Sequence, residues 1–493
     1  MMSYLKLCQH FVRLSHFQHL GAICGWDQAA IMPVGGQEAR ANAMAELATL
    51  QHQLLNDLSL PEWFQAASDE MLTENEAISL REMKRVWQQA TILPESLVQA
   101  KSLAGSRCEH AWRQQRVEND WTGFKHNLEQ VVSLSREEAQ YRADIANTTP
   151  YNAMLDLYEP GMTTTKIDAL FDDIKSWLPE LIQQASDNQG AHLPQTPTGP
   201  FSINKQKQLG LEIMGWLGFD FDRGRLDTSV HPFCGGVPSD VRITTRYDEN
   251  DFTSTLMGVI HETGHARYEQ GLPKAWAGLP VGEARSMGIH ESQSLFFEMQ
   301  LSRHPDFIAR LAPKIKQHFH RENDPALSAA NLVRLNNQIS PGLIRVDADE
   351  VTYPAHIILR YEIEKALIEG AIEVADLPDV WDQKMQAYLG ISTAGDYRNG
   401  CMQDIHWTDG SFGYFPSYTL GAMYAAQFMA AMKKTVDVDS VIRSGNLSPI
   451  FTWLSDNIWS KGSLLSTDEL VKHATGETLN AQFFQEHLRS RYL

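Results

Sequence analysis

Two histidines four residues apart give this sequence its clearest chemical signal. The stretch "GVIHETGHARYEQG" contains His261 and His265, with Glu262 directly after the first histidine. A helix is predicted over 252–270, because "DENDFTS" supplies N-capping side chains and Gly271 suits the position after a helix C-terminus. On such a helix the two imidazoles lie on one face about one turn apart, which is the spacing that lets them share a zinc ion.

The rest of this helix fits a metal site, although a simpler explanation exists. Glu262 lies one position round from His261, where it could reach a metal-bound water without binding the metal itself. Gly258 and Gly264 are poor helix formers, so they indicate that another segment packs closely against the helix. The alternative is an isolated pair of core histidines, since two ligands do not make a stable zinc site.

A third ligand is predicted in "SMGIHESQSLFFEMQ" (286–300), whose apolar residues also have helical spacing. Glu291 follows His261 by thirty residues, which leaves room for a helix, a loop and an antiparallel return. Its carboxylate could complete a site with His261 and His265 and leave the fourth position open for water. The alternative is a solvated glutamate. The usual orienting acid one turn later is absent, because position 295 is Leu.

These groups together predict amide hydrolysis. Zinc would lower the pKa of a bound water towards neutrality, and Glu262 would take its proton. The resulting hydroxide would attack a polarised carbonyl, and Glu262 could then protonate the leaving amine.

The elements that must position these residues are mainly helices. Apolar side chains at helical spacing predict further helices over 38–57, 76–92, 124–146, 163–186, 203–217, 288–302, 360–375 and 417–433. The Pro- and Gly-containing stretch 187–200 is a predicted seam within one catalytic domain, between an N-terminal helical part (1–190) and the part with the motifs (200–493).

One segment has the period of a strand. In "SDVRITTRYD", β-branched and aromatic side chains alternate with a polar set that would share one face: Asp240, Arg242, Thr244 and Arg246. Because it follows the turn-forming "HPFCGGVPS", it predicts a small β-hairpin near 231–248. The fold class is therefore mainly α with a minor β element.

Composition indicates which classes of binding partner and which cellular compartment to expect. The formal net charge of −19 repels nucleic acid and anionic membranes, and no run of eighteen apolar residues occurs. The N-terminus lacks the unbroken apolar core of a signal peptide. Five scattered cysteines without a CxxC pair fit free thiols in a reducing compartment. We therefore expect a cytoplasmic protein that binds neither nucleic acid nor membrane.

Several motifs in one order resemble the carboxypeptidase Taq family of zinc metallocarboxypeptidases. "HETGH" is followed by "HESQS", and the other family-like segments are "WDQAAIMPVGGQEAR" (26–40), "HPF" (231–233), "DVRIT" (240–244), "IRVDAD" (344–349) and "GCMQDIHW" (400–407). Trp26 and Asp27, in the first of these segments, are predicted to be structural.

The resemblance implies a grooved helical fold akin to that of neurolysin and angiotensin-converting enzyme. It implies a cytoplasmic homodimer that removes single residues from peptide C-termini, using one zinc ion that cobalt can replace. By position, His261, His265 and Glu291 would be the metal ligands and Glu262 the general base.

A carboxypeptidase must bind a free carboxylate, for which the rigid fork of arginine is suited. Arg345 in "IRVDAD" is the first candidate and Arg242 in "DVRIT" is the second. The alternative for each is a structural salt bridge, with Asp347 or Asp240 as the neighbouring acid.

Other motif residues could complete the site. His231 and Arg246 could close the blind end of the groove beside the hairpin. His406 and Tyr418 could donate hydrogen bonds to the oxyanion of the tetrahedral intermediate, and their spacing is similar to that of the donors in angiotensin-converting enzyme. Tyr414 is the competing choice, and a tyrosine packed among phenylalanines is the structural alternative.

Two other functions compete with this prediction. A zinc oligoendopeptidase of similar fold would also cleave peptides blocked at the C-terminus. A helical binding protein with a non-functional HExxH would contain no stoichiometric zinc.

Overall fold

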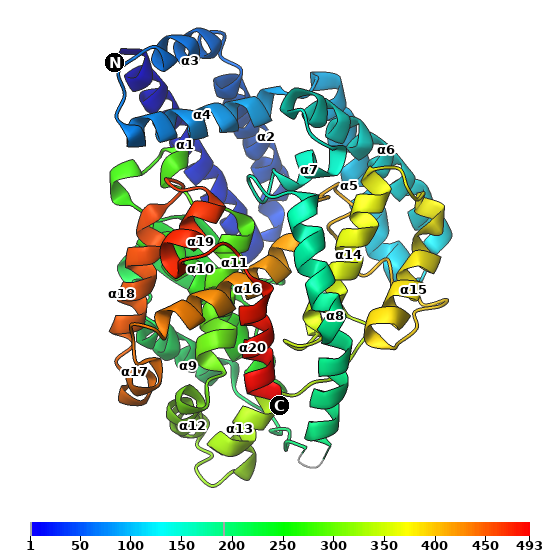
Figure 1. The fold of residues 1–493 in the computed structure, drawn as a ribbon, viewed down its shortest axis with the longest axis vertical. Helices are drawn as coiled ribbons and strands as arrows, with labels where there is room; N and C mark the ends of the chain where they lie inside the picture. The colour runs from blue at the N-terminus through cyan, green and yellow to red at the C-terminus, as the bar shows by residue number, and fades with distance from the viewer. Residues whose placement is uncertain (1, 191–192) are drawn as a thin grey trace.

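The computed structural model describes residues 2–190 and 193–493, and Figure 1 shows that helices dominate this part of the chain. The first ten helices are α1 (Met2–Ala30), α2 (Gln37–Leu55), α3 (Leu60–Ser68), α4 (Glu74–Thr91), α5 (Glu95–Val117), α6 (Trp121–Ala146), α7 (Pro150–Leu155), α8 (Thr164–Gln189), α9 (Ile203–Trp216) and α10 (Phe252–Gly271). They are followed by α11 (Met287–Leu295), α12 (Pro305–Phe319), α13 (Ala329–Asn336), α14 (Tyr353–Ile368), α15 (Leu377–Leu389), α16 (Pro416–Met432), α17 (Val438–Ser444), α18 (Ser448–Asn457), α19 (Thr467–Thr475) and α20 (Ala481–Tyr492).

The mainly α fold class is confirmed, and most predicted helices lie within a few residues of observed ones. One is displaced, because the helix expected over 360–375 is α14, which ends at Ile368. Gly370 follows with a φ of 74°, a left-handed conformation that glycine adopts readily after a helix. The helix expected over 288–302 is α11 continued by a π-helix, Phe296–Ser302. None of the described helices is long and apolar enough to span a membrane.

The predicted hairpin is present and belongs to a three-stranded sheet in the order β1-β3-β2. Strands β2 (Phe233–Val237) and β3 (Asp240–Thr245) are antiparallel, and β1 (Gly224–Thr228) pairs with β3 in parallel. Val241 and Ile243 are buried in a small cluster that also contains residues of α9 and α10. The sheet thus packs against the helix that carries the two histidines.

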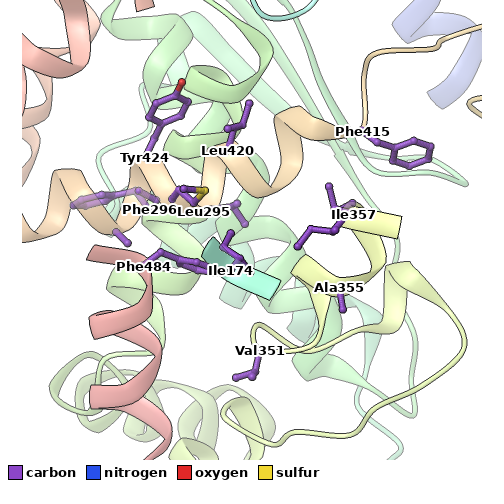
Figure 2. Packing of buried hydrophobic residues seen from close by; sticks show 14 of the residues in the cluster. Ile174, Leu295, Phe296, Val351, Ala355, Ile357, Phe415, Leu420, Tyr424 and Phe484 are labelled. Atoms are coloured by element: carbon purple, nitrogen blue, oxygen red, sulfur yellow. The ribbon is translucent and has the colours of Figure 1, made fainter. Parts of the chain in front are cut away.

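Two further hydrophobic clusters hold the helices together. The larger one contains side chains from both sides of 187–200, and Figure 2 shows residues of α8, α14, α16 and α20 around Leu295 and Phe296. The smaller one joins helices α1, α3 and α4 to Leu279 and Val281. The segment between α10 and α11 therefore anchors the N-terminal helices to the rest of the molecule.

Helix α1 is also fixed to the sheet by polar contacts. Two guanidinium groups lie over the Trp26 ring, that of Arg225 at 5.1 Å and that of Arg242 at 4.5 Å from its centroid. Arg242 donates to both oxygens of Asp240, at 2.5 and 2.9 Å. His19 of α1 lies 3.2 Å from the same carboxylate. Cation–π contacts combined with ion pairs thus hold α1 against the hairpin.

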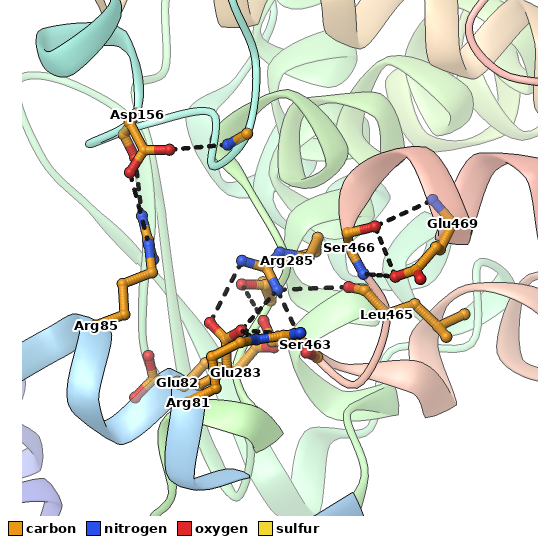
Figure 3. A network of polar contacts seen from close by, with 12 residues as sticks. Arg81, Glu82, Arg85, Asp156, Glu283, Arg285, Ser463, Leu465, Ser466 and Glu469 are labelled. Atoms are coloured by element: carbon orange, nitrogen blue, oxygen red, sulfur yellow. Dashed lines mark hydrogen bonds and ion pairs between the residues drawn. The ribbon is translucent and has the colours of Figure 1, made fainter. Parts of the chain in front are cut away.

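A buried arginine joins the N-terminal helices to the C-terminal region (Figure 3). Arg285, which precedes α11, donates to Glu82 of α4 and to the carbonyl oxygens of Ser463 and Leu465, at distances of 3.3 to 3.4 Å. Because an unpaired buried charge is costly, this network favours one relative position of the three segments.

Candidate metal centre and active site

Helix α10 begins and ends where specific contacts require it. The Asp251 side chain accepts from the amides of Thr253 and Ser254 at 3.0 and 3.1 Å, so the predicted N-cap is present. The role predicted for Gly271 is wrong, because it is the last residue of the helix and has no left-handed backbone. A Cβ atom at Gly271 would lie 2.7 Å from the Trp459 ring, so close packing requires glycine there.

Glycines bring three helices into close contact around the histidines. A Cβ atom at Gly264 would lie 2.5 Å from the carbonyl oxygen of Gln293, so the predicted close packing is confirmed at this position. At Gly421 of α16, a Cβ atom would lie 2.7 Å from Cγ of Glu291. The same prediction for Gly258 is wrong, since nothing lies within 4 Å of the equivalent point.

His261, His265 and Glu291 meet between α10 and α11. Glu291 Oε2 lies 3.8 Å from His261 Nε2 and 3.3 Å from His265 Nε2, and the three ligand atoms all lie within 4.8 Å of one another. Two imidazole nitrogens and one carboxylate oxygen form a typical donor set for catalytic zinc, with metal–ligand distances of about 2 Å. The residues present therefore fit a divalent metal ion.

Each imidazole also has a partner at its other nitrogen. His261 Nδ1 lies 2.9 Å from Oε2 of Glu298, whose other oxygen accepts from Arg303 at 3.1 Å. Sequence reasoning missed this orienting acid, because it tested only the position one turn after Glu291. Glu298 lies in the π-helix that continues α11, where the wider turns change which side chains face α10.

His265 is supported by a second histidine rather than directly by a carboxylate. Its Nδ1 lies 2.6 Å from Nδ1 of His290, and Nε2 of His290 lies 2.8 Å from Oε1 of Glu269. Both partners were missed, although a local signal existed. His290 immediately precedes Glu291, and Glu269 follows His265 by one helical turn.

The carboxylates of the site create a negative electrostatic potential around the two histidines. Burial raises the pKa of Glu262 to about 7. Burial also raises the pKa of Glu291, but His261 and His265 outweigh this effect and lower it to about 2. Burial lowers the pKa of His261, yet the carboxylates of Glu291 and Glu298 raise it to about 10. The field that holds a proton on His261 equally favours a divalent cation.

A cavity of about 1160 Å³ opens over this cluster. Its walls come from α1, β2, α10, α11 and the segment between α10 and α11, and Glu262 lines it beside the three ligand residues. His16 and His19 of α1 also face the cavity. A helix from the beginning of the chain therefore forms one wall of the site, which sequence reasoning did not anticipate.

Tyr414 and Tyr418 line the same cavity, and His406 lies behind them. Nε2 of His406 is 3.2 Å from the Tyr418 hydroxyl, and its ring centroid is 5.5 Å from that of Tyr414. Burial lowers the pKa of His406 to about 4, so its imidazole is neutral near pH 7. The structure thus brings together the predicted oxyanion donors.

Arg345 lies beside this group, buried at 6% exposure and outside the cavity lining. Its Nε donates to Asp404 at 2.9 Å and its Nη1 donates to the Tyr353 hydroxyl at 2.8 Å. The guanidinium lies 5.1 Å from the centroid of the Tyr418 ring. Its acidic partner is fifty-nine residues away, and not the neighbouring Asp347 considered from the sequence.

The remaining predicted substrate-binding residues lie outside the cavity lining. Arg242 pairs with Asp240 and stacks on Trp26, as the structural alternative predicted. His231 and Arg246 are exposed, and neither faces the cavity. The lysine and arginine that do line the cavity, within the described ranges, are Arg223 and Lys274, which sequence reasoning did not single out.

The paired histidines, the nearby glutamates and the cavity above them define a metallopeptidase site within a helical fold. The family described as Carboxypeptidase Taq (M32) metallopeptidase matches residues 6–492, and the chain belongs to this family. It is therefore a metallocarboxypeptidase, a hydrolase of peptide bonds. This assignment is supported over the endopeptidase and binding-protein alternatives.

Relatives and solved structures agree over nearly the whole length. Carboxypeptidase 1 of Bacillus subtilis is 37% identical, over 97% of this chain and 96% of the relative. Thermostable carboxypeptidase 1 of Thermus thermophilus is 36% identical, over 99% and 98%. The structure of Trypanosoma cruzi metallocarboxypeptidase 1 has a TM-score of 0.98 and 43% identity, covering 100% of this chain and 99% of that one. An M32 carboxypeptidase from Deinococcus radiodurans has a TM-score of 0.94 and 32% identity, with 100% and 99% covered.

Proposed function

We propose that this chain is one catalytic domain that holds a single zinc ion through His261, His265 and Glu291. It would release single residues from the C-termini of peptides with broad specificity. The observation that carries the proposal is the convergence of three ligand atoms within 4.8 Å, beside Glu262 in a cavity. The two-nitrogen, one-oxygen donor set suits zinc, and cobalt can occupy the same ligands.

Glu262 is the general base in this proposal. When bound, the metal ion would polarise the scissile carbonyl and make water more acidic. The Glu262 carboxylate accepts the proton of the attacking water and returns it to the leaving amine. Burial raises the pKa of Glu262 to about 7, so it holds a proton more readily than an exposed glutamate does.

Tyr418 and His406 would stabilise the oxyanion. Tyr418 lines the cavity, and His406 Nε2, 3.2 Å from its hydroxyl, can hold that hydroxyl in one orientation. A donor already aligned in this way costs little reorganisation when charge develops on the substrate oxygen. Tyr414 is the competing donor, because its side chain lines the same wall.

Arg345 is the proposed partner of the substrate carboxylate, and Arg242 is the second candidate. Support for Arg345 comes from its position behind Tyr418 and from an Nη1 that is bonded only to a neutral hydroxyl, that of Tyr353. A carboxylate replacing this hydroxyl would form a stronger, charge-assisted bond. Lys274 is a competing cation, since it lines the cavity directly.

Matched peptides test the proposal. We expect free-acid peptides to lose single C-terminal residues in mass spectrometry, and a chelator to abolish this release. The same peptides with an amidated C-terminus should be poor substrates, because they lack the charge that an arginine recognises. Equal cleavage of free-acid and amidated peptides would contradict C-terminal recognition. His265→Ala should lose both zinc and activity, and a full zinc complement in that variant would refute the ligand assignment.

We further propose that the enzyme works as a homodimer in the cytoplasm. All five cysteines are free thiols, as a reducing compartment requires. Sedimentation equilibrium of the purified protein tests the oligomeric state, with twice the chain mass of 55.6 kDa as the expected result.

A further inference from the structure

The two histidines of the proposed metal site have unlike supports. His261 is bonded to the buried carboxylate of Glu298, which Arg303 neutralises. His265 is hydrogen-bonded to another imidazole, that of His290, which carries no charge when it is neutral. An imidazole can present either a donor or an acceptor at the same nitrogen, so it does not by itself fix the tautomer of its neighbour.

The proton positions along this chain of contacts follow from the metal site. His265 must keep the lone pair of Nε2 free, because that atom is the proposed metal ligand and lies 3.3 Å from the Glu291 carboxylate that would share the metal ion. Its proton therefore lies on Nδ1 and is donated to Nδ1 of His290, 2.6 Å away. His290 must then carry its own proton on Nε2, and it donates that proton to Glu269 at 2.8 Å. This is the arrangement of neutral rings in which each contact has one donor and one acceptor.

Glu269 determines which atom donates at each hydrogen bond of this series. A carboxylate accepts hydrogen bonds and cannot donate them, so Glu269 favours the His290 tautomer with the proton on Nε2. Without Glu269, His290 could place its proton on Nδ1, where it would oppose the proton of His265 across 2.6 Å. His265 would then rotate or exchange its tautomer, and the nitrogen needed for the metal would be lost.

We infer that His290 and Glu269 are positioning residues that hold His265 in the tautomer and orientation required for metal binding. The inference rests on the proposed metal site. Glu269 is the last member of this series of hydrogen bonds and lines the cavity, whereas Glu298 is bonded to Arg303. Partners of this kind typically contribute a factor of about 10 to 100 in metal affinity.

Zinc affinity of the metal-free full-length protein, measured by competition with a chromophoric chelator, tests the inference. We expect His290→Leu to raise the zinc Kd by about 10- to 100-fold and Glu269→Ala to raise it by a similar or smaller factor. His290→Asn should stay within a few-fold of the parent, because its Oδ1 can still accept from His265. The double variant His290→Leu/Glu269→Ala should be no weaker than His290→Leu alone, since the two residues act through one chain of bonds.

A spectroscopic measurement separates positioning from general loss of stability. In zinc-loaded protein with nitrogen-15-labelled histidine, the ring resonances should show His265 protonated at Nδ1 and His290 protonated at Nε2, and Glu269→Ala should change the His290 pattern. A zinc Kd for His290→Leu within twofold of the parent, while His265→Ala binds no zinc, would overturn the inference and leave the metal site standing. Normal zinc binding by His265→Ala would overturn both.

Discussion

Glu262 and Glu291 lie in different chemical environments. Glu262 is 8% exposed, it lines the cavity and burial raises its pKa to about 7, whereas Glu291 is held as a carboxylate between two histidines. A carboxylate that binds a metal ion must stay ionised, whereas a general base needs a pKa near the pH of the solution. In the proposed mechanism, their surroundings would thus assign the role of metal ligand to Glu291 and that of general base to Glu262.

Replacing Glu262 by glutamine should abolish turnover and retain the metal. Glutamine preserves the shape of the side chain but cannot accept a proton. General-base assistance contributes about a hundred- to ten-thousandfold, so kcat should fall at least a hundredfold. Plasma emission should still detect one zinc per chain. A variant with a tenth of normal kcat would show that another group is the base.

The roles of Tyr414 and Tyr418 can be distinguished by removing the hydroxyl group of each in turn. Tyr418→Phe should lower kcat by about a hundred- to a thousandfold with little change in KM, because an oxyanion donor acts only in the transition state. Tyr414→Phe is the matched control and should change kcat by much less. The opposite ranking of the two variants in steady-state kinetics would assign the donor role to Tyr414.

At the scale of elements, helix α1 depends on the hairpin for its position. Arg242 combines an ion pair to Asp240 with a contact to the Trp26 ring and has a side chain only 16% exposed. Arg225 makes the equivalent ring contact but is 54% exposed. Burial makes the first of these otherwise similar contacts the stronger one.

The variant Arg242→Gln should therefore lower the thermal midpoint more than Arg225→Gln does, as measured by circular dichroism. It should also raise KM, since α1 forms a wall of the cavity, and it should leave zinc content unchanged. If Arg242→Gln instead loses the preference for free-acid over amidated peptides at an unchanged midpoint, Arg242 binds the substrate carboxylate directly.

Local patterns in the sequence were sufficient to predict most of these elements. The helix with His261 and His265, the helix with Glu291 and the β2–β3 hairpin each follow from spacings between residues close together in the sequence. Strand β1 was missed because it is short and pairs in parallel with a strand that lies beyond β2 in the chain.

Contacts between distant segments could not be predicted in this way. The partner of Arg345 is Asp404, which no local spacing identifies, and Glu298 faces His261 within a π-helical segment. Both depend on how whole helices pack rather than on the periodicity of any one of them. The same reason explains why α1 was not expected in the cavity wall.

At the scale of the whole molecule, a buried carboxylate links three segments. Glu364 of α14 accepts hydrogen bonds from Trp407, from the amide of Gly413 and from the hydroxyl of Tyr151 on α7. Burial nevertheless raises its pKa to about 7, because these donors do not replace the lost hydration of the charge. The folded protein therefore binds a proton at Glu364 more tightly than the unfolded chain does.

This difference predicts how stability changes with pH. The pKa of Glu364 is about 7 in the folded protein and 4.5 for an unperturbed glutamate, so its contribution to the free energy of unfolding is complete below about pH 4.5 and is lost as pH rises through about 7. The urea midpoint of the parent should therefore fall relative to that of Glu364→Gln as pH rises from about 5 to 8, because glutamine does not titrate. Parallel midpoints across this range would contradict the raised pKa.

The contact of Trp26 with Arg225 and Arg242 also limits when the fold can be completed during synthesis of the chain. Helix α1 is synthesised before the sheet, and its partners there emerge from the ribosome only after about two hundred further residues have been added. Non-local contacts of this kind form late and slow folding. The nascent N-terminal helices must therefore wait with part of their apolar surface uncovered. A chain that ends before β3 cannot enclose the cavity, however well its own helices form.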